Sequence, residues 1–303
     1  MGLSRRLQAD LSIIGLSAIW GCSFVIMKRA LDDISPMLLT TLRFGSASLL
    51  LYLVTPKGSL ADASGAPRWP ALQGGALTGL LLFAGFACQT IGIQYTTPAR
   101  SAFITGLYVI FTPLLSMGLG MRRPSVTSFA GAALALVGLY LLTGAASGGV
   151  GFGYGETLTL FAAVAFSAHL LAVDHYTRRH DKRAIAFLQV AVVAVLAMAP
   201  ALFVEQRRFV PTTSLFAALA VTSLLATALA FFVLNTVQSW TTPTRAAILF
   251  AAEPVFAAIT SWAVEGELLT GLAMIGALLI LAGMLTAELG PAVRARRQPE
   301  AAL

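Results

Sequence analysis

A glutamate lies inside one of the apolar stretches of this 303-residue chain, where a carboxylate is chemically unusual. Glu253 falls within the stretch from Ala246 to Val264, well away from both of its ends. An ionisable group held in lipid is costly and marks a pathway for protons, ions or solutes. A low dielectric disfavours the charged form of a carboxyl group, so Glu253 is suited to exchange protons near physiological pH. The adjacent Pro254 supports an alternative, in which Glu253 only accompanies a kinked helix.

Other polar and aromatic residues lie at related depths in the apolar stretches, judged at about 1.5 Å per helical residue. One set lies on the outer side of the midplane and one on the inner side, with Trp20 near the middle. We predict that the following residues contact a solute: Trp20, Phe24, Arg43, Gln89, Tyr108, His169 and Asn235. Each has a structural alternative. Trp20 and Phe24 suit helix packing, His169 suits a hydrogen bond to a backbone carbonyl, and Asn235 suits a bridge between helices.

Other kinds of chemistry have little support in the sequence. The three histidines lack the helical spacing of a metal-binding pair, and the glycine-rich stretch from Gly144 to Gly155 fits neither phosphate-binding motif. Cys22 and Cys88 both lie in apolar stretches, which excludes a disulfide framework. We therefore predict no metal, no cofactor and no catalytic residues. Spacing alone leaves open an enzyme embedded in the membrane.

Composition shows which solvent this chain must face. Hydrophobic residues make up 57% of the chain and charged residues 11%, against about 25% charged in soluble domains. A helix needs about 20 apolar residues to cross the hydrocarbon of a bilayer. We predict an all-α integral membrane protein with ten transmembrane helices: 11–31, 37–54, 72–95, 101–120, 126–144, 157–176, 184–204, 215–240, 246–264 and 268–289.

Two halves of the chain repeat each other. Thr96 to Ala102 matches Thr241 to Ala247, and Gly131 to Gly138 matches Gly276 to Gly283, both at a separation of 145 positions. Five spans per repeat is an odd number, so the second repeat must be inverted in the membrane, as in many transporters. The predicted divisions are a first repeat (1–145), a linker (146–155), a second repeat (156–290) and a polar cytoplasmic tail (291–303).

Pro113 falls inside the fourth span and Pro254 inside the ninth. Because proline cannot donate to the carbonyl four residues earlier, each is expected to kink its helix. They are not at equivalent positions of the repeat, so the kinks are expected at non-equivalent places.

Basic residues are distributed unevenly between the two sides of the predicted bundle. With the N-terminus inside, fourteen fall on the inner side and five on the outer side, as the positive-inside rule requires. The inner set is Arg5, Arg6, Lys57, Arg68, Arg122, Arg123, Arg178, Arg179, Lys182, Arg183, Arg245, Arg294, Arg296 and Arg297; the outer set is Lys28, Arg29, Arg100, Arg207 and Arg208. We predict a multi-pass protein of the plasma (bacterial inner) membrane with both termini cytoplasmic. The net charge of +7 is explained by this orientation, so no nucleic-acid partner is predicted.

Several short motifs resemble the EamA type of the drug/metabolite transporter superfamily. They are Trp20-Gly21, Ser23-Phe24, Lys28 to Leu31, Pro36 and Arg43 in the first repeat, and Glu253 to Ala257, Glu265 to Glu267 and Gly276 to Gly283 in the second. The resemblance covers essentially the whole chain. It implies a ten-helix inverted-repeat secondary transporter, usually an exporter of metabolites, amino acids or drugs, with helices 1, 3, 4, 6, 8 and 9 lining a central cavity. The first repeat departs from this pattern at its acidic positions. Thr112 precedes Pro113, and Arg122-Arg123 stand near the place where the second repeat has Glu265 and Glu267.

These observations predict a secondary transporter that exports small metabolites, amino acids or drugs by alternating access, and not an enzyme. Its predicted partners are a small-molecule solute, protons at Glu253 and membrane lipid, with no obligatory protein partner. A solute exchanger or uniporter of the same fold is the first alternative. A membrane-embedded enzyme acting on lipid is the second.

Overall fold

The structure is a computed structural model, and it describes residues 5–60, 69–119, 126–142, 152–237, 240, 249–269 and 271–297. Within these ranges the chain is almost entirely helical, and the only strand-like feature described is an isolated bridge between Ile34 and Phe209. Several predicted features lie outside them: the linker as far as residue 151, the second copy of the Thr-Thr-Pro motif, and Arg68, Arg122, Arg123 and Arg245.

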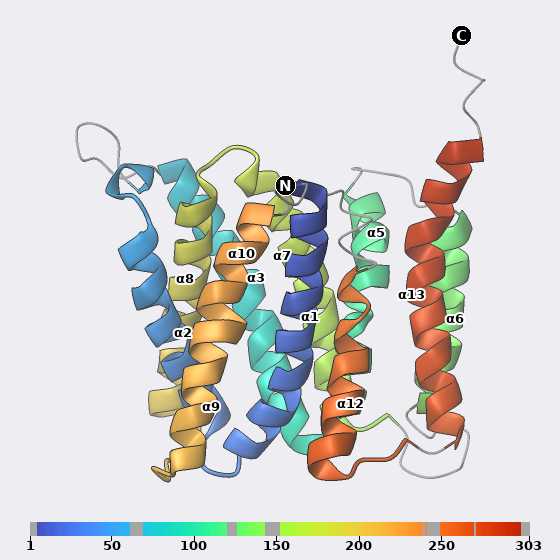
Figure 1. Cartoon of the computed structure of the whole chain (residues 1–303). Coiled ribbons are helices and arrows are strands. Elements are labelled where there is room, and N and C mark those ends of the chain that lie inside the picture. Colours follow the sequence, from blue (N-terminus) through green and yellow to red (C-terminus); the bar gives the residue numbers. More distant parts are fainter. Residues whose placement is uncertain are drawn as a thin grey trace.

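The helices stand side by side as one bundle (Figure 1). Their bounds are α1 Arg5–Ala30, α2 Pro36–Val54, α3 Trp69–Gly92, α4 Pro98–Gly106, α5 Tyr108–Gly118, α6 Val126–Leu142, α7 Tyr154–Thr177, α8 Lys182–Phe203, α9 Thr213–Ser223, α10 Ala230–Val237, α12 Glu253–Glu265 and α13 Gly271–Arg297. Short 3₁₀ segments follow α2 and α3 (η1 Lys57–Ser59 and η2 Ile93–Tyr95), and a π-helical segment, η4 Leu224–Leu229, joins α9 to α10.

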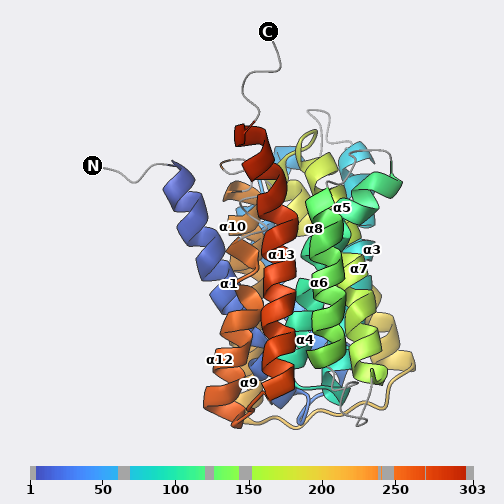
Figure 2. The same ribbon diagram turned by 90° about the vertical axis from the view of Figure 1, so that its right-hand side faces the viewer.

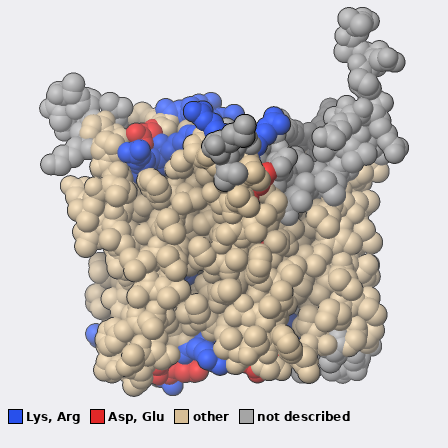
Figure 3. Space-filling model, viewed as in Figure 1, with Lys and Arg blue, Asp and Glu red and all other residues tan. Residues whose placement is uncertain are grey.

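Seven helical stretches are long and apolar enough to cross a membrane: Arg5–Ala30, Pro36–Val54, Trp69–Tyr95, Pro98–Gly118, Tyr154–Thr177, Lys182–Phe203 and Thr213–Val237. The shorter apolar segments Val126–Leu142 and Gly271–Thr286, together with α12, match the other predicted spans. Charged side chains on the visible face gather at the two ends and leave an uncharged band between them (Figure 3). The start of α1 and the end of α13 lie at the same end (Figure 1). The predicted all-α, multi-pass membrane fold is confirmed.

The last helix of each repeat packs against the other along its length, and the pair α6–α13 forms one side of the bundle (Figure 2). The glycines of the repeated sequence motif make this contact. A Cβ atom on Gly138 would lie 2.6 Å from the carbonyl oxygen of Gly276 and 2.8 Å from the backbone nitrogen of Ile280. Only glycine permits backbones to approach this closely, which is a common device in membrane helix packing.

Two predicted spans are interrupted near their centres. The fourth span is divided at Leu107 into α4 and α5, and the ninth turns at Ala251 and Ala252 before α12 begins at Glu253. Leu107 and Ala252 are 145 positions apart, so the interruptions are equivalent in the repeat. The prediction of kinks at non-equivalent places is therefore wrong.

The prolines explain only one of these interruptions. Pro254 lies in the first turn of α12, where its missing N–H would have no helical partner in any case. Pro113 lies inside α5 without ending it, and the break comes six positions earlier. At the far end, α13 continues as a helix to Arg297 and not only to the predicted end at residue 289.

Helices α2 and α8 are joined at both ends by a carboxylate contact, which we call a clasp. One clasp joins the start of α2 to the loop after α8, and the other joins the start of α8 to the loop after α2. Glu205, in the loop after α8, accepts hydrogen bonds from the backbone N–H groups of Met37 at 3.0 Å and Leu38 at 2.9 Å. Asp181 is the N-cap of α8 and accepts a hydrogen bond from Ser59 Oγ, in the loop after α2, at 2.7 Å. These two clasps fix the position of α2, which carries Arg43.

Candidate solute-binding cavity

A cavity lies in the middle of the bundle, between helices of both repeats. It is lined by Trp20, Ser23, Phe24, Arg43, Leu82, Phe86, Gln89, Thr105, Tyr108, Phe166, His169, Leu170, Phe231, Leu234, Phe250 and Glu253. The set brings together seven of the eight residues predicted from sequence, including Glu253. The eighth, Asn235, is buried next to Leu234 but is not a lining residue; its Nδ2 atom has no hydrogen-bond partner among the described atoms.

Arg43 is the only Lys or Arg side chain among the lining residues, and it is 2% exposed. Its Nε donates to Thr227 Oγ1 at 2.7 Å, Nη1 lies 3.0 Å from Met27 Sδ, and Nη2 lies 3.3 Å from the carbonyl oxygen of Ala226. The guanidinium carbon also lies 5.3 Å and 5.0 Å from the ring centres of Phe44 and Phe86, within the range of a cation–π contact. Within the described part of the chain, none of the ion pairs includes Arg43.

Trp20 is held in the cavity wall from two directions. Its indole Nε1 donates to the carbonyl oxygen of Ala226 at 2.9 Å. Its ring stacks on Phe250 with centroids 5.6 Å apart and lies 6.3 Å from the ring of Phe231. The indole therefore packs against neighbouring rings and also lines the cavity. Its contact with a solute stays a prediction.

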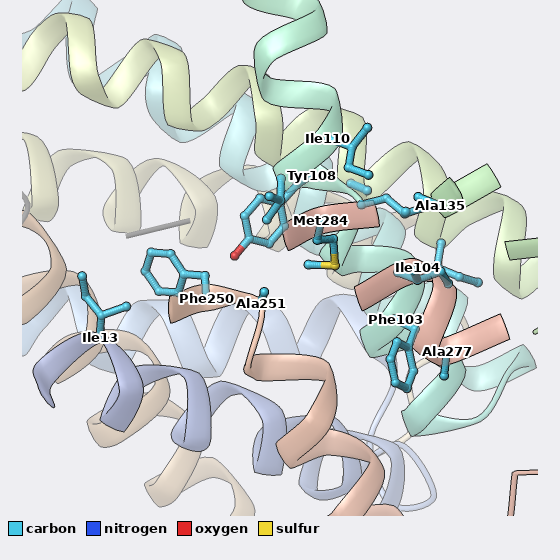
Figure 4. Packing of buried hydrophobic residues seen from close by; sticks show 14 of the residues in the cluster. Ile13, Phe103, Ile104, Tyr108, Ile110, Ala135, Phe250, Ala251, Ala277 and Met284 are labelled. Carbon is cyan, nitrogen blue, oxygen red and sulfur yellow. The ribbon is translucent and has the colours of Figure 1, made fainter. Parts of the chain in front are cut away.

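Glu253 is the first residue of α12 and is 7% exposed. The main chain of α1 approaches it closely, because a Cβ atom on Gly21 would lie 2.6 Å from the Glu253 carbonyl oxygen. Among the residues that the structure describes, no hydrogen bond or ion pair to its carboxylate is present. Tyr108, its repeat equivalent, also lines the cavity, and Figure 4 shows the Tyr108 hydroxyl directed toward the segment of Phe250 and Ala251.

The amide and imidazole groups of the cavity have partners within the bundle. His169 Nε2 lies 2.7 Å from Gln189 Oε1, and Gln89 Nε2 donates to Thr105 Oγ1 at 3.1 Å. His169 therefore bonds a side-chain amide, not the backbone carbonyl of the alternative interpretation. Gln189 is the repeat equivalent of Arg43, so one repeat places a cation at this position and the other places an amide.

Sequence reasoning missed the residues that hold Arg43 and Trp20. Thr227 and the carbonyl group of Ala226 belong to the π-helical segment η4, and nothing in an apolar sequence such as Leu224–Leu229 signals a change of helical register. Phe231 and Phe250 were also missed, because phenylalanine in an apolar stretch is ordinary core composition.

The end of α1 is fastened to its neighbours by its two basic residues. Arg29 Nε donates to Glu265 Oε1 at 2.6 Å. Lys28 Nζ donates to three backbone carbonyl oxygens, those of Ile93 at 2.8 Å, Gln94 at 2.9 Å and Thr96 at 3.1 Å. These contacts tie the end of α1 to the end of α12 and to the segment between α3 and α4.

A membrane bundle made of two similar halves around a polar and aromatic cavity has the architecture of a secondary transporter. The EamA-like transporter family matches residues 7–144 and again residues 153–287. The chain belongs to the EamA-like transporter family, and the double match confirms the repeat.

Two similar proteins are named as transporters or efflux pumps, and a solved structure shares the fold. An archaeal protein from Archaeoglobus fulgidus, named as an uncharacterized transporter, is 34% identical over 94% of this chain and 87% of its own length. A Salmonella typhimurium protein named as a probable amino-acid metabolite efflux pump is 26% identical over 91% of this chain and 93% of its own. A crystal structure that is 22% identical superposes with a TM-score of 0.67 over 97% of this chain and 99% of that chain, which supports the fold alone.

Proposed function

We propose that this transporter exports small zwitterionic metabolites of the amino-acid class, with apolar or aromatic side chains, by alternating access. The observation that carries the proposal is that Arg43 and Glu253 line one cavity and do not pair with each other. A cation and a carboxylate held apart match the carboxylate and ammonium groups of a free amino acid. The aromatic rings around them suit an apolar side chain. The name of the Salmonella relative is consistent with this substrate class.

Proton coupling is proposed to occur at Glu253. The protonated carboxyl would release the solute ammonium group, and the deprotonated carboxylate would attract it, so proton and solute compete for one site. Such competition is the requirement for exchange of one against the other. The cytoplasmic location of both termini, and the plasma membrane as the site of action, are part of the same proposal.

Counterflow in proteoliposomes tests the substrate class. Radiolabelled phenylalanine and leucine should exchange against unlabelled solute inside the vesicles and be recovered unchanged. Phenethylamine, which lacks the carboxylate, and phenylpropionate, which lacks the amine, should compete at least about tenfold more weakly, since a lost charged partner costs about 1.4 kcal/mol or more. Equal competition by the amine or the acid would reject a zwitterion site. Chemical alteration of the solute would support the enzyme alternative.

Orientation is tested with reporters. A reporter fused after Leu303 should lie in the cytoplasm, and one inserted between Gly144 and Gly155 should lie outside. Two reporters on the same side would contradict an inverted arrangement with five spans in the first repeat.

A further inference from the structure

Arg43 and the carboxyl group of Glu253 line one cavity, and neither forms an ion pair within the described part of the chain. Attraction between opposite charges is strong at low effective dielectric. An arginine side chain is long and flexible enough to change its direction by rotation about its side-chain bonds. The contacts that hold the guanidinium where it is therefore decide whether it can turn toward the carboxylate.

The π-helical segment η4 supplies two of these contacts. Thr227 is fully buried and its hydroxyl accepts the Arg43 Nε hydrogen at 2.7 Å, while it donates to the carbonyl of Thr222 at 2.8 Å. The preceding residue, Ala226, presents a carbonyl oxygen to both Arg43 Nη2 and Trp20 Nε1. Two successive residues thus direct acceptors to the same cavity wall, close to α1 and α2.

The π register is what makes this arrangement possible. In a regular α-helix each backbone carbonyl accepts from the N–H group four residues later, whereas a π turn shifts the partner by one residue. Thr222 and Thr227 are five positions apart, which is the π spacing. π turns of this kind occur frequently at functional sites.

We propose that η4 is a charge separator: Thr227 and the Ala226 carbonyl hold the Arg43 guanidinium away from Glu253, so that the empty cavity keeps one positive and one negative pole. Thr227 is a positioning residue that acts through Arg43. The use of the two poles for a zwitterion rests on the proposed function, but the separation itself does not. Without the Thr227 hydroxyl, Arg43 turns to Glu253 and the two charges satisfy each other.

Variants of Thr227 test the consequence for binding. Thr227→Val keeps the shape of the side chain and removes the acceptor, so phenylalanine binding should weaken at least tenfold. Thr227→Ser keeps the hydroxyl and should bind within about twofold of wild type. Thr78→Val is the matched control, because Thr78 is also fully buried but its hydroxyl bonds only carbonyls of its own helix. That control should leave binding unchanged.

A double-mutant cycle on thermal unfolding tests the separation independently of any solute. Arg43→Met, Glu253→Gln and the double variant are each compared with the parent protein above neutral pH. The set is measured twice, once with Thr227 intact and once in the Thr227→Val background. The coupling between the two substitutions in their effects on Tm should be weak with Thr227 intact and clearly stronger in Thr227→Val, because only the second background contains the new ion pair. If Thr227→Val does not fold, Thr227→Ala serves for the same cycle.

The outcomes separate this inference from the proposed function. Equal coupling in both backgrounds, including none in either, overturns the charge separator, whether or not phenylalanine binds. Coupling that is clearly stronger in Thr227→Val or Thr227→Ala supports it, even if phenylalanine, leucine and their analogues all fail to bind the wild-type protein. In that case only the proposed substrate class is rejected.

Discussion

Tyr108 and Glu253 occupy equivalent positions of the two repeats, and each is the first residue of a helix that begins in the middle of an interrupted span. Both side chains line the cavity. The N-terminus of a helix carries partial positive charge, which stabilises a nearby carboxylate. In discontinuous transporter helices such ends lie near the midplane and face the substrate. Both repeats therefore contain the same interruption, but only the second repeat places a carboxyl group there.

Glu253→Gln should abolish accumulation of solute driven by a pH gradient while solute exchange at equal pH continues. Glutamine has the shape of the protonated acid and cannot release a proton. The substitution should therefore uncouple solute transport from the pH gradient while the cavity still binds solute. Uptake of labelled phenylalanine into proteoliposomes, with and without a pH gradient, measures both activities. Glu265→Gln is the control, because Glu265 pairs with Arg29 at one end of the bundle and should leave coupling intact.

Two other results would change the interpretation of Glu253. Loss of both activities together with a lower Tm would make Glu253 a structural partner of the interrupted helix. Full gradient-driven transport by the glutamine variant would remove it from the mechanism.

Trp20→Phe should lower the free energy of unfolding by about 1 kcal/mol, the typical value of one hydrogen bond. The smaller ring can still stack on Phe250 but cannot donate to the carbonyl of Ala226. Trp20→Ala should cost about 3 kcal/mol or more, because it also removes the ring. Chemical denaturation in detergent measures these differences. Trp262→Ala, at a position that is 59% exposed, should cost much less.

The sequence predicts the fold well because membrane insertion leaves a strong signal. Long apolar stretches predict the spans, and the matches at a separation of 145 positions predict the two similar halves. The depths of Arg43, Tyr108 and Glu253 also follow from their positions along the apolar stretches. Seven of the eight predicted site residues accordingly line one cavity.

The remaining features depend on contacts between distant segments, which composition does not encode. Gly106 ends α4 directly before the interruption at Leu107, but glycine is also common inside membrane helices and does not by itself predict a break. The π register of η4 depends on what its acceptors bond in α1 and α2. Asn235 does not line the cavity although it lies at the expected depth, because depth along a helix does not specify the direction in which a side chain points.

Gly138→Ala should destabilise the protein by about 1 to 3 kcal/mol, the usual cost of overpacking. Its new Cβ atom would lie against the backbone of α13, which cannot yield as a flexible side chain can. Gly118→Ala is the matched control, because no heavy atom lies within 4 Å of a Cβ atom there. In a helix this second change should be neutral or stabilising by about 0.4 to 1 kcal/mol. Equal effects of the two substitutions on Tm would contradict the close α6–α13 contact.

The clasps at α2 and α8 obey the repeat but exchange their chemistry. Ser35, the N-cap of α2, is equivalent to Asp181, and Ser59 is equivalent to Glu205, each 146 positions along the chain. In one clasp the carboxylate is therefore the N-cap residue, and in the other it belongs to the loop. One carboxylate per clasp is enough, because a second would repel the first.

Asp181→Asn should lower Tm at neutral pH and have little effect in acid. Burial raises the pKa of Asp181, but hydrogen bonds from Ser59 Oγ and from the backbone N–H groups of Arg183 and Ala184 outweigh it and hold the pKa below its ordinary value. A carboxylate whose pKa is lower in the folded state stabilises that state above the unfolded pKa of about 3.9. The contribution is lost as the pH falls through the lower pKa of the folded state. The Tm difference between wild type and Asp181→Asn should therefore be largest near pH 7 and shrink toward zero in strong acid. Asp174→Asn is the control: Asp174 forms an exposed pair with Arg178, and such pairs contribute little. A difference for Asp181→Asn that does not change with pH would show that the carboxylate charge has no part in the clasp.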